Sequence, residues 1–349
     1  MNQQIAVVFG QTHQKLTGLL FLSLFVALPV NASDSGHKYS VRGPAFSNPS
    51  KLATVPAGWQ ARPVKYLPIH KGADLVVALG QQSYPIFKNV IADYAKKNKL
   101  KIIVKSGTCG ITAGRLLRKT VDIGAYCCPP GKTDRLPGLE FHALGVSPIA
   151  LIVHPDNPLT NISRKQARQI FQGLVSRWSE VVPGQAKAFN KPIQPVGRLH
   201  CKVRPGHWRL LLKNEDLFSA RLFEVGVIPD MISRVSRNSR AIGYETPLMV
   251  KHHQSKGKVK MLRINGHEPG DTAYMLSGQY PLYRVYHLVT WKQDNKTNQQ
   301  ARKLVRFLQT YIENHYQEIG YIPPSQLKKA GWRFRRNELI GEPVHGRRR

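Results

Sequence analysis

In the first half of the chain, continuous apolar runs alternate with segments whose apolar residues recur at helical spacing. Residues 73–79 form an almost continuous apolar run, and shorter apolar runs follow at 101–104 and 121–125. Between the first two runs, residues 84–99 carry apolar side chains at helical spacing. A second amphipathic segment separates the second run from the third. Buried strands alternating with helices predict an α/β fold with a parallel sheet.

Three loops follow these predicted strands, at residues 80–83, 106–110 and 126–128. Ligands of such sheets bind beyond the carboxyl ends of the strands. We therefore expect these loops to lie close together and to form part of a binding site.

The remainder of the chain continues the mixed pattern. Ser163 is placed to cap a helix over residues 164–172, which Gly173 ends. The other expected elements are strands at 147–154, 193–196, 241–244 and 283–290 and a long helix at 298–313.

The first 32 residues have the organisation of an export signal. Lys15 precedes the apolar residues 16–30, and small residues stand before a cleavage point near Ala32. An uncleaved anchor helix is the alternative interpretation. Cleavage would leave a periplasmic or otherwise secreted protein that opens with an N-terminal extension, residues 33–72, rich in Pro, Gly and Ser.

The chain is strongly basic, with 52 Lys and Arg residues against 20 Asp and Glu residues and a net charge of +32. Residues 326–349 form an especially basic C-terminal tail. This charge favours anionic partners. The export signal and the lack of a nucleic-acid-binding motif argue against nucleic acid as the primary partner.

Several short motifs along the chain indicate a known family through their sequences and their order. They include Gly80-Gln81-Gln82-Ser83, Ser106-Gly107-Thr108-Cys109-Gly110, His154-Pro155-Asp156-Asn157-Pro158, Pro195-Val196-Gly197-Arg198, Ala241-Ile242-Gly243-Tyr244, Tyr280-Pro281-Leu282-Tyr283-Arg284 and Gly320-Tyr321-Ile322-Pro323. Over residues 73–324 the chain resembles the phosphate-binding proteins of ABC importers, which are type II periplasmic solute-binding proteins.

That resemblance implies two lobes, mixed sheets flanked by helices, and a ligand cleft between the lobes. Lobe 1 would be discontinuous, with residues 73–147 and 247–325, and lobe 2 would be residues 148–246. It also implies a monomer that closes on a small anion and docks on an ABC permease or a membrane sensor. Such a protein binds without turnover and is not an enzyme.

The family holds its anion with hydroxyls, N–H groups at helix starts and one arginine. Ser83, Thr108 and Arg198 match these positions. The full ligand-binding set expected from the resemblance is Ser83, Tyr84, Ser106, Thr108, Cys109, Gly110, Cys127, Cys128, Arg198, Cys201 and Lys202.

The four cysteines depart from the family pattern, because all of them fall on expected cleft loops. Three explanations stay open. Cys109 pairs with Cys127 or Cys128 in a disulfide; the four thiols, helped by His200, bind copper, zinc or trivalent arsenic; or the thiols are small fillers beside an oxyanion.

The function predicted from the sequence is capture of phosphate or a related oxyanion, with no cofactor unless a metal is bound. The alternatives are a protein whose cleft cysteines bind a thiophilic metal or metalloid, and a sensor or adhesion protein that retains the fold. Cys201 with His200 or His207 offers a Cys–His pair, but no third residue that would orient it is evident.

Overall fold

A computed structural model of the chain describes residues 46–182, 189–199, 211–212 and 215–344. The predicted signal peptide and the start of the N-terminal extension lie outside the described residues. So do three of the predicted site residues, His200, Cys201 and Lys202.

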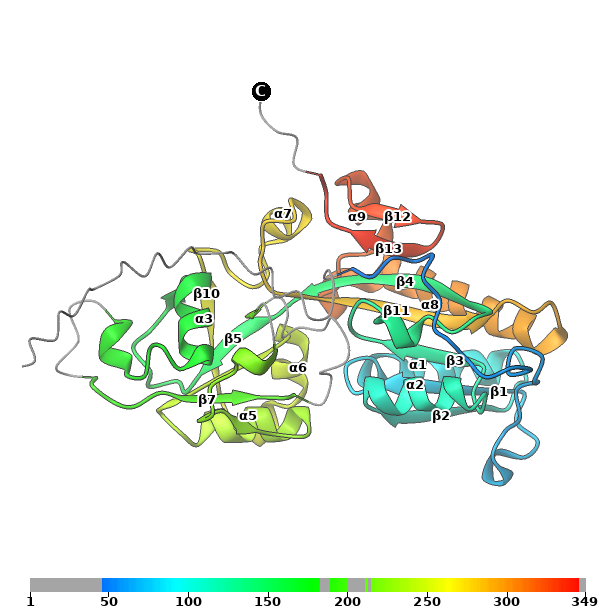
Figure 1. Cartoon of the computed structure of the whole chain (residues 1–349), viewed down its shortest axis with the longest axis horizontal. Coiled ribbons are helices and arrows are strands. Elements are labelled where there is room, and N and C mark those ends of the chain that lie inside the picture. The colour runs from blue at the N-terminus through cyan, green and yellow to red at the C-terminus, as the bar shows by residue number, and fades with distance from the viewer. Residues whose placement is uncertain (1–45, 183–188, 200–210, 213–214, 345–349) are drawn as a thin grey trace, which may run out of the picture. The chain divides into compact units, whose positions relative to one another are not determined.

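The first sheet is built from β1 (Leu75–Gly80), β2 (Ile102–Gly107), β3 (Ile123–Tyr126), β4 (Leu139–Pro148) and β11 (Tyr283–Trp291). The strand order is β2-β1-β3-β11-β4 (Figure 1). β1 runs parallel to β2 and β3, and β11 runs antiparallel to β3 and β4. Helices α1 (Tyr84–Lys97) and α2 (Cys109–Leu117) connect the parallel strands, and α8 (Lys296–Ile319) follows β11. The predicted strand–helix alternation is confirmed.

The second sheet is built from β5 (Ala150–Val153), β6 (Asn161–Ile162), β7 (Gln194–Gly197), β8 (Phe223–Glu224), β9 (Ala241–Glu245) and β10 (Lys260–Ile264), in the order β6-β10-β5-β9-β7-β8. Helices α3 (Arg164–Gln172), α5 (Ile228–Ser236), α6 (Pro247–His252) and α7 (Thr272–Leu276) accompany it. Ser163 caps α3 together with Gln166, and Gly173 ends it at a φ of 78°. This helix has the predicted bounds because both of its ends are encoded locally.

The buried apolar residues form two clusters, one centred on each sheet, and the cluster of the second sheet also takes in Val146 of β4 and Val285 of β11. Phe87 and Ile91 of α1 belong to the core of the first sheet, whereas Phe171 of α3 and Trp178 belong to that of the second. The protein therefore has two lobes, here called the first and second lobe after their sheets.

The lobes are joined by a continuous stretch of chain. β4 ends at Pro148 and β5 begins at Ala150, so only Ile149 separates a strand of the first sheet from a strand of the second. The strand expected at 147–154 thus divides at this residue. The long preceding part of β4, residues 139–146, was not predicted as a strand.

The predicted lobe boundary at residue 247 is wrong for one strand. β10 pairs antiparallel with β5 and parallel with β6, which places it in the second lobe. Its buried residues Leu262 and Ile264 alternate with the exposed Met261 and Arg263. This alternation suits a strand, but it carries no information about which sheet the strand joins. The chain returns to the first sheet at β11.

The N-terminal extension packs on the first lobe from residue 46 onward. Trp59 is buried, and its Nε1 donates a hydrogen bond to the carbonyl oxygen of Leu117 at 2.8 Å. The Lys119 Nζ lies 4.5 Å from the centre of the Trp59 ring and 5.1 Å from that of Trp291. The segment is therefore part of the fold.

The described residues of the expected C-terminal tail, 326–344, form secondary structure. Helix α9 (Pro324–Lys329) leads to an antiparallel hairpin of β12 (Arg333–Arg335) and β13 (Glu338–Gly341). Leu327, Trp332 and Leu339 are buried. The sequence analysis did not predict this packing, because basic residues far outnumber these three apolar residues in the segment.

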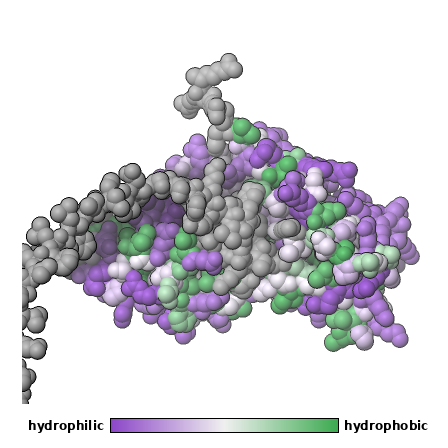
Figure 2. All heavy atoms as spheres, in the orientation of Figure 1, coloured by the Kyte–Doolittle hydropathy of each residue, from purple (hydrophilic) through white to green (hydrophobic). Residues whose placement is uncertain are grey.

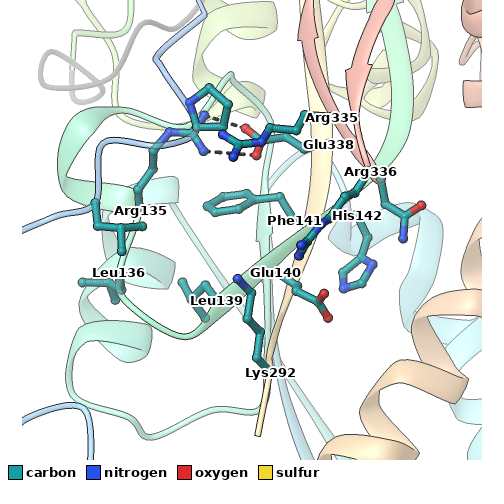
Figure 3. Close-up of a pocket in the computed structure, with 13 residues that line it drawn as sticks. Arg135, Leu136, Leu139, Glu140, Phe141, His142, Lys292, Arg335, Arg336 and Glu338 are labelled. Atoms are coloured by element: carbon teal, nitrogen blue, oxygen red, sulfur yellow. Dashed lines mark hydrogen bonds and ion pairs between the residues drawn. The ribbon is translucent and has the colours of Figure 1, made fainter.

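Arg135 holds the hairpin to the first lobe (Figure 3). Its two terminal nitrogens donate to the Glu338 carboxylate at 2.5 Å and 3.1 Å, and its Nε donates to Ser47 Oγ at 2.8 Å. A cavity of about 220 Å³ adjoins this ion pair. None of the predicted site residues lines it.

Short 3-10 turns complete the fold at Pro68–His70, Lys132–Asp134, Trp178–Glu180, Glu215–Leu217 and Gln254–Lys256. Figure 2 shows a mainly hydrophilic face with hydrophobic side chains in small, scattered groups. Across the described ranges, no helix combines the length and the apolar character that a membrane span requires.

Candidate functional site

The three predicted loops lie close together at the carboxyl ends of the parallel strands of the first sheet. β1, β2 and β3 are parallel, so their carboxyl ends lie together. Gln81, Gln82 and Ser83 follow β1, helix α2 begins two residues after the end of β2, and Cys127 follows β3 directly. The structure thus brings together side chains that are far apart in the sequence.

Three cysteines form a cluster at this edge. The Sγ atoms of Cys109, Cys127 and Cys128 all lie within 4.8 Å of one another. Those of Cys109 and Cys127 are 3.2 Å apart, longer than a disulfide bond of about 2.05 Å, and none of the three cysteines is in a disulfide. The hydrogen bond with Cys109, followed by burial, raises the pKa of the Cys127 thiol to about 11.

The start of α2 fixes the position of Cys109. Thr108 caps this helix by accepting a hydrogen bond from the Ile111 N–H at 3.3 Å, and Cys109 is the first helical residue. Gly110 lies in the same first turn. The loop sequence therefore places a hydroxyl, a thiol and helix N–H groups side by side.

Arg198 lies at the second lobe's side of the site. It follows β7, it is only 4% exposed, and its backbone N–H donates to the hydroxyl of Tyr244 at 2.8 Å. Its Nη2 forms a 2.5 Å ion pair with the Glu245 carboxylate. Among the described residues, its buried Nε has no hydrogen-bond partner.

Arg284 was missed as a site residue. It stands near the start of β11, with Nη1 3.7 Å from the Cys127 Sγ and Nη2 3.7 Å from the Glu245 carboxylate. Both Arg284 and Glu245 are buried. The available signal was a cation within the apolar strand predicted at 283–290.

Two glutamines connect the lobes. The Gln82 side-chain amide donates to Glu245 at 2.6 Å, and Arg198 Nη1 donates to the Gln81 side chain at 3.5 Å. Glu245 therefore accepts hydrogen bonds from both lobes. Ser83, the predicted ligand of this loop, is buried, and its side chain makes no capping hydrogen bond to α1.

A cavity of about 550 Å³ adjoins these groups and has walls from both lobes. Tyr84, Ser106 and Thr108, all predicted site residues, line it on the side of the first lobe. The start of α5 and two histidines, His252 and His253, line it on the side of the second lobe. We take this cavity as the candidate ligand cleft.

A family model described as "PBP superfamily domain" matches residues 68–310. Two proteins named "Phosphate-binding protein PstS 2", from serotype V and serotype III strains of Streptococcus agalactiae, are each 26% identical to the chain over 110 residues. That alignment spans 31% of this chain and 37% of each relative, about a third of their length.

Two solved structures are similar in fold. An ABC-type phosphate transport receptor from Vibrio cholerae is 17% identical, with a TM-score of 0.56 over 72% of this chain and 100% of its own. A putative phosphate ABC transporter substrate-binding protein with bound phosphate, from Clostridium perfringens, is 16% identical, with a TM-score of 0.60 over 71% of this chain and 98% of its own. The predicted resemblance and fold class are confirmed.

Proposed function

The chain belongs to the PBP superfamily, and on that premise we propose that it is an exported substrate-binding protein that captures a small oxyanion, phosphate first, in the cleft between its lobes. The related proteins are named as phosphate-binding proteins and phosphate transport receptors. Capture without turnover, followed by docking on an ABC permease or a membrane sensor, is the corresponding mode of action.

The observation that carries this proposal is the environment of Arg198. Its guanidinium is buried beside the cleft and keeps one N–H, the Nε, without a hydrogen-bond partner among the described residues. A buried donor of this kind costs free energy unless a ligand accepts from it. Guanidinium groups bind the oxygens of a tetrahedral anion through several charge-assisted hydrogen bonds.

The local charge supports an anion as well. Arg198 and Arg284 share the single carboxylate of Glu245, so these three buried groups carry a net positive charge. The N-terminus of α2 adds backbone N–H groups and the positive end of a helix dipole. Such an arrangement favours an anion over a neutral or cationic solute.

The cysteines affect which groups would hold the anion. Thiols are weak hydrogen-bond donors, and they stand in the loops where the resemblance implies hydroxyls. The proposed ligand is therefore phosphate or an oxyanion of similar size, held mainly by arginine and backbone N–H groups.

Lobe closure would depend on the glutamines that follow β1. Gln82 reaches Glu245 and Gln81 reaches Arg198, so each makes a contact that lobe opening would break. An anion that binds Arg198 and the start of α2 together would stabilise the closed form.

Isothermal titration calorimetry of the exported chain with inorganic phosphate, and separately with sulfate, tests the proposal. We expect saturable one-to-one binding of phosphate. The absence of heat with every oxyanion tried, in protein that unfolds cooperatively, would contradict it.

A further inference from the structure

We propose that Cys109, Cys127 and Cys128 form a second, three-sulfur site that binds a trivalent thiophilic metalloid supplied as its neutral hydroxide, with arsenite as the probe. This site goes beyond oxyanion capture, because it uses thiols rather than the guanidinium of Arg198. Its donors come from two elements, the first turn of α2 and the segment after β3.

The spacing of the thiols suits three bonds to one atom. All three Sγ atoms lie within 4.8 Å of one another. A trivalent metalloid keeps a lone pair and is pyramidal, so bonds of about 2.3 Å, the length of a zinc–thiolate bond, would place its three sulfurs about 3.4 Å apart. Small side-chain rotations are therefore enough to close the thiols around a central atom.

The donor number favours a three-coordinate centre. In the part of the chain that the structure describes, no histidine, aspartate or glutamate joins the three thiols within the same radius. Zinc in structural sites takes four protein ligands. A trivalent metalloid forms three bonds and completes its valence with the sulfurs present.

The charge balance favours the same centre. Each thiol exchanges with one hydroxide: three sulfur–arsenic bonds form, three oxygen–arsenic bonds break, and three water molecules leave with the thiol protons. No electrons are transferred, and the site remains neutral. Zinc on three thiolates would leave one negative charge and copper(I) would leave two. The guanidinium beside Cys127 is that of Arg284, which already shares Glu245 with Arg198, so a neutral centre makes the smaller demand on this buried network.

The cluster has a route for entry. All three cysteines are at most 8% exposed, yet Thr108, the neighbour of Cys109, lines the 550 Å³ cavity between the lobes. The cysteines themselves do not line this cavity, and we expect a small neutral hydroxide to reach them past Thr108. Because burial excludes bulk water, the sulfur–arsenic bonds would be shielded from hydrolysis.

Native mass spectrometry of the reduced full chain titrated with arsenite tests the site. We expect one arsenic per chain, with a mass gain equal to one arsenic atom less three hydrogens. C109A, C127A and C128A should each lose this three-sulfur adduct. C201S, which changes the remaining cysteine, should keep it.

Thermal melting of each variant separates loss of the site from loss of the fold. Where an alanine variant melts early, the corresponding Cys→Ser variant provides a second test. R198A should bind arsenite as the wild type does while losing phosphate, so failure of one proposal is distinguishable from failure of the other.

Three results would overturn the three-sulfur site. These are no adduct with correctly folded wild type, an adduct that has lost only two hydrogens, and a Cys109–Cys127 disulfide in protein isolated from the exported compartment without reductant. Displacement of arsenite by an equimolar amount of zinc would also count against a trivalent centre.

Discussion

Arg198 and Glu245 form an ion pair of 2.5 Å in which the carboxylate is fully buried and the arginine is 4% exposed. The pair connects β7 with the end of β9, and Gln82 reaches it from the other lobe. A buried pair of this kind is maintained only when its geometry and its additional hydrogen bonds offset the cost of desolvation. The site is therefore highly sensitive to changes at either residue.

Replacing Arg198 tests the proposed oxyanion site. In R198A we expect phosphate affinity to fall by at least about tenfold, because a charge-assisted hydrogen bond contributes roughly 1.5–3 kcal/mol. R198K should recover part of the affinity, since lysine keeps the charge but not the fork of donors. Calorimetry measures both variants.

The matched control is R263A. The Arg263 side chain is 45% exposed and lies 3.8 Å from Glu268, so its loss should leave phosphate binding unchanged. Equal phosphate affinities in R198A and the wild type would remove Arg198 from the site.

Replacing Glu245 tests the structural role of the same network. E245Q leaves two buried guanidinium groups, those of Arg198 and Arg284, without their shared countercharge. We expect the free energy of unfolding to drop by about 3–5 kcal/mol, as measured by urea denaturation. E268Q removes an exposed carboxylate and should change it by less than about 1 kcal/mol. Similar losses in both variants would argue against the buried network.

Trp59 tests whether the N-terminal segment stabilises the fold. Its ring is 4% exposed and lies 5.9 Å from that of Trp291. W59A should lower the free energy of unfolding by roughly 3–5 kcal/mol, the usual cost of truncating a buried aromatic residue. I69A, at an 80% exposed position of the same segment, should have an effect within about 0.5 kcal/mol. A stable W59A protein would show that residues 46–72 pack without stabilising the first lobe.

The pH dependence of stability should carry a contribution from His287. Burial in β11, with a smaller effect of Arg135, lowers the pKa of this histidine to about 3, and its Nε2 accepts a hydrogen bond from the Leu339 N–H at 3.3 Å. Below pH 6.5 the unfolded chain binds a proton that the folded chain does not. The stabilising contribution is therefore complete above pH 6.5 and falls as the pH drops toward 3, by roughly 1.4 kcal/mol per pH unit.

H287Q isolates that contribution from those of other buried histidines. Glutamine can still accept a hydrogen bond from the Leu339 N–H, but it does not titrate. Urea unfolding of both proteins between about pH 7 and pH 4 should give a shallower decline for H287Q. Parallel curves would mean that His287 is accessible to protons in the folded state.

The sequence predicts the elements whose signals are local. α3 has the expected bounds because Ser163 and Gly173 encode its two ends, and the approach of Cys109 to Cys127 follows from the parallel order of β1, β2 and β3. Long-range partners have no such local signal. β10 was assigned to the wrong lobe because its two-residue period fits either sheet.

β4 was missed for a related reason. Nine of its ten residues are buried, so the alternation of apolar and polar residues at 139–143 does not continue along the strand. It also contains Gly145 at a φ of 136°, where a Cβ would collide with the carbonyl oxygen of Ile322, a residue far along the chain. Glu245 and Arg284 were overlooked likewise, because each becomes a site residue only through partners on other strands.

Arg135 has a consequence for the connectivity of the whole fold. Its guanidinium binds both Ser47, near the first described residue, and Glu338, in the last strand. Residues near the two ends of the described chain therefore meet at one side chain, so this part of the polypeptide is almost a closed ring. A ring of this kind is suited to circular permutation, in which a short linker joins the old ends and the chain is opened elsewhere.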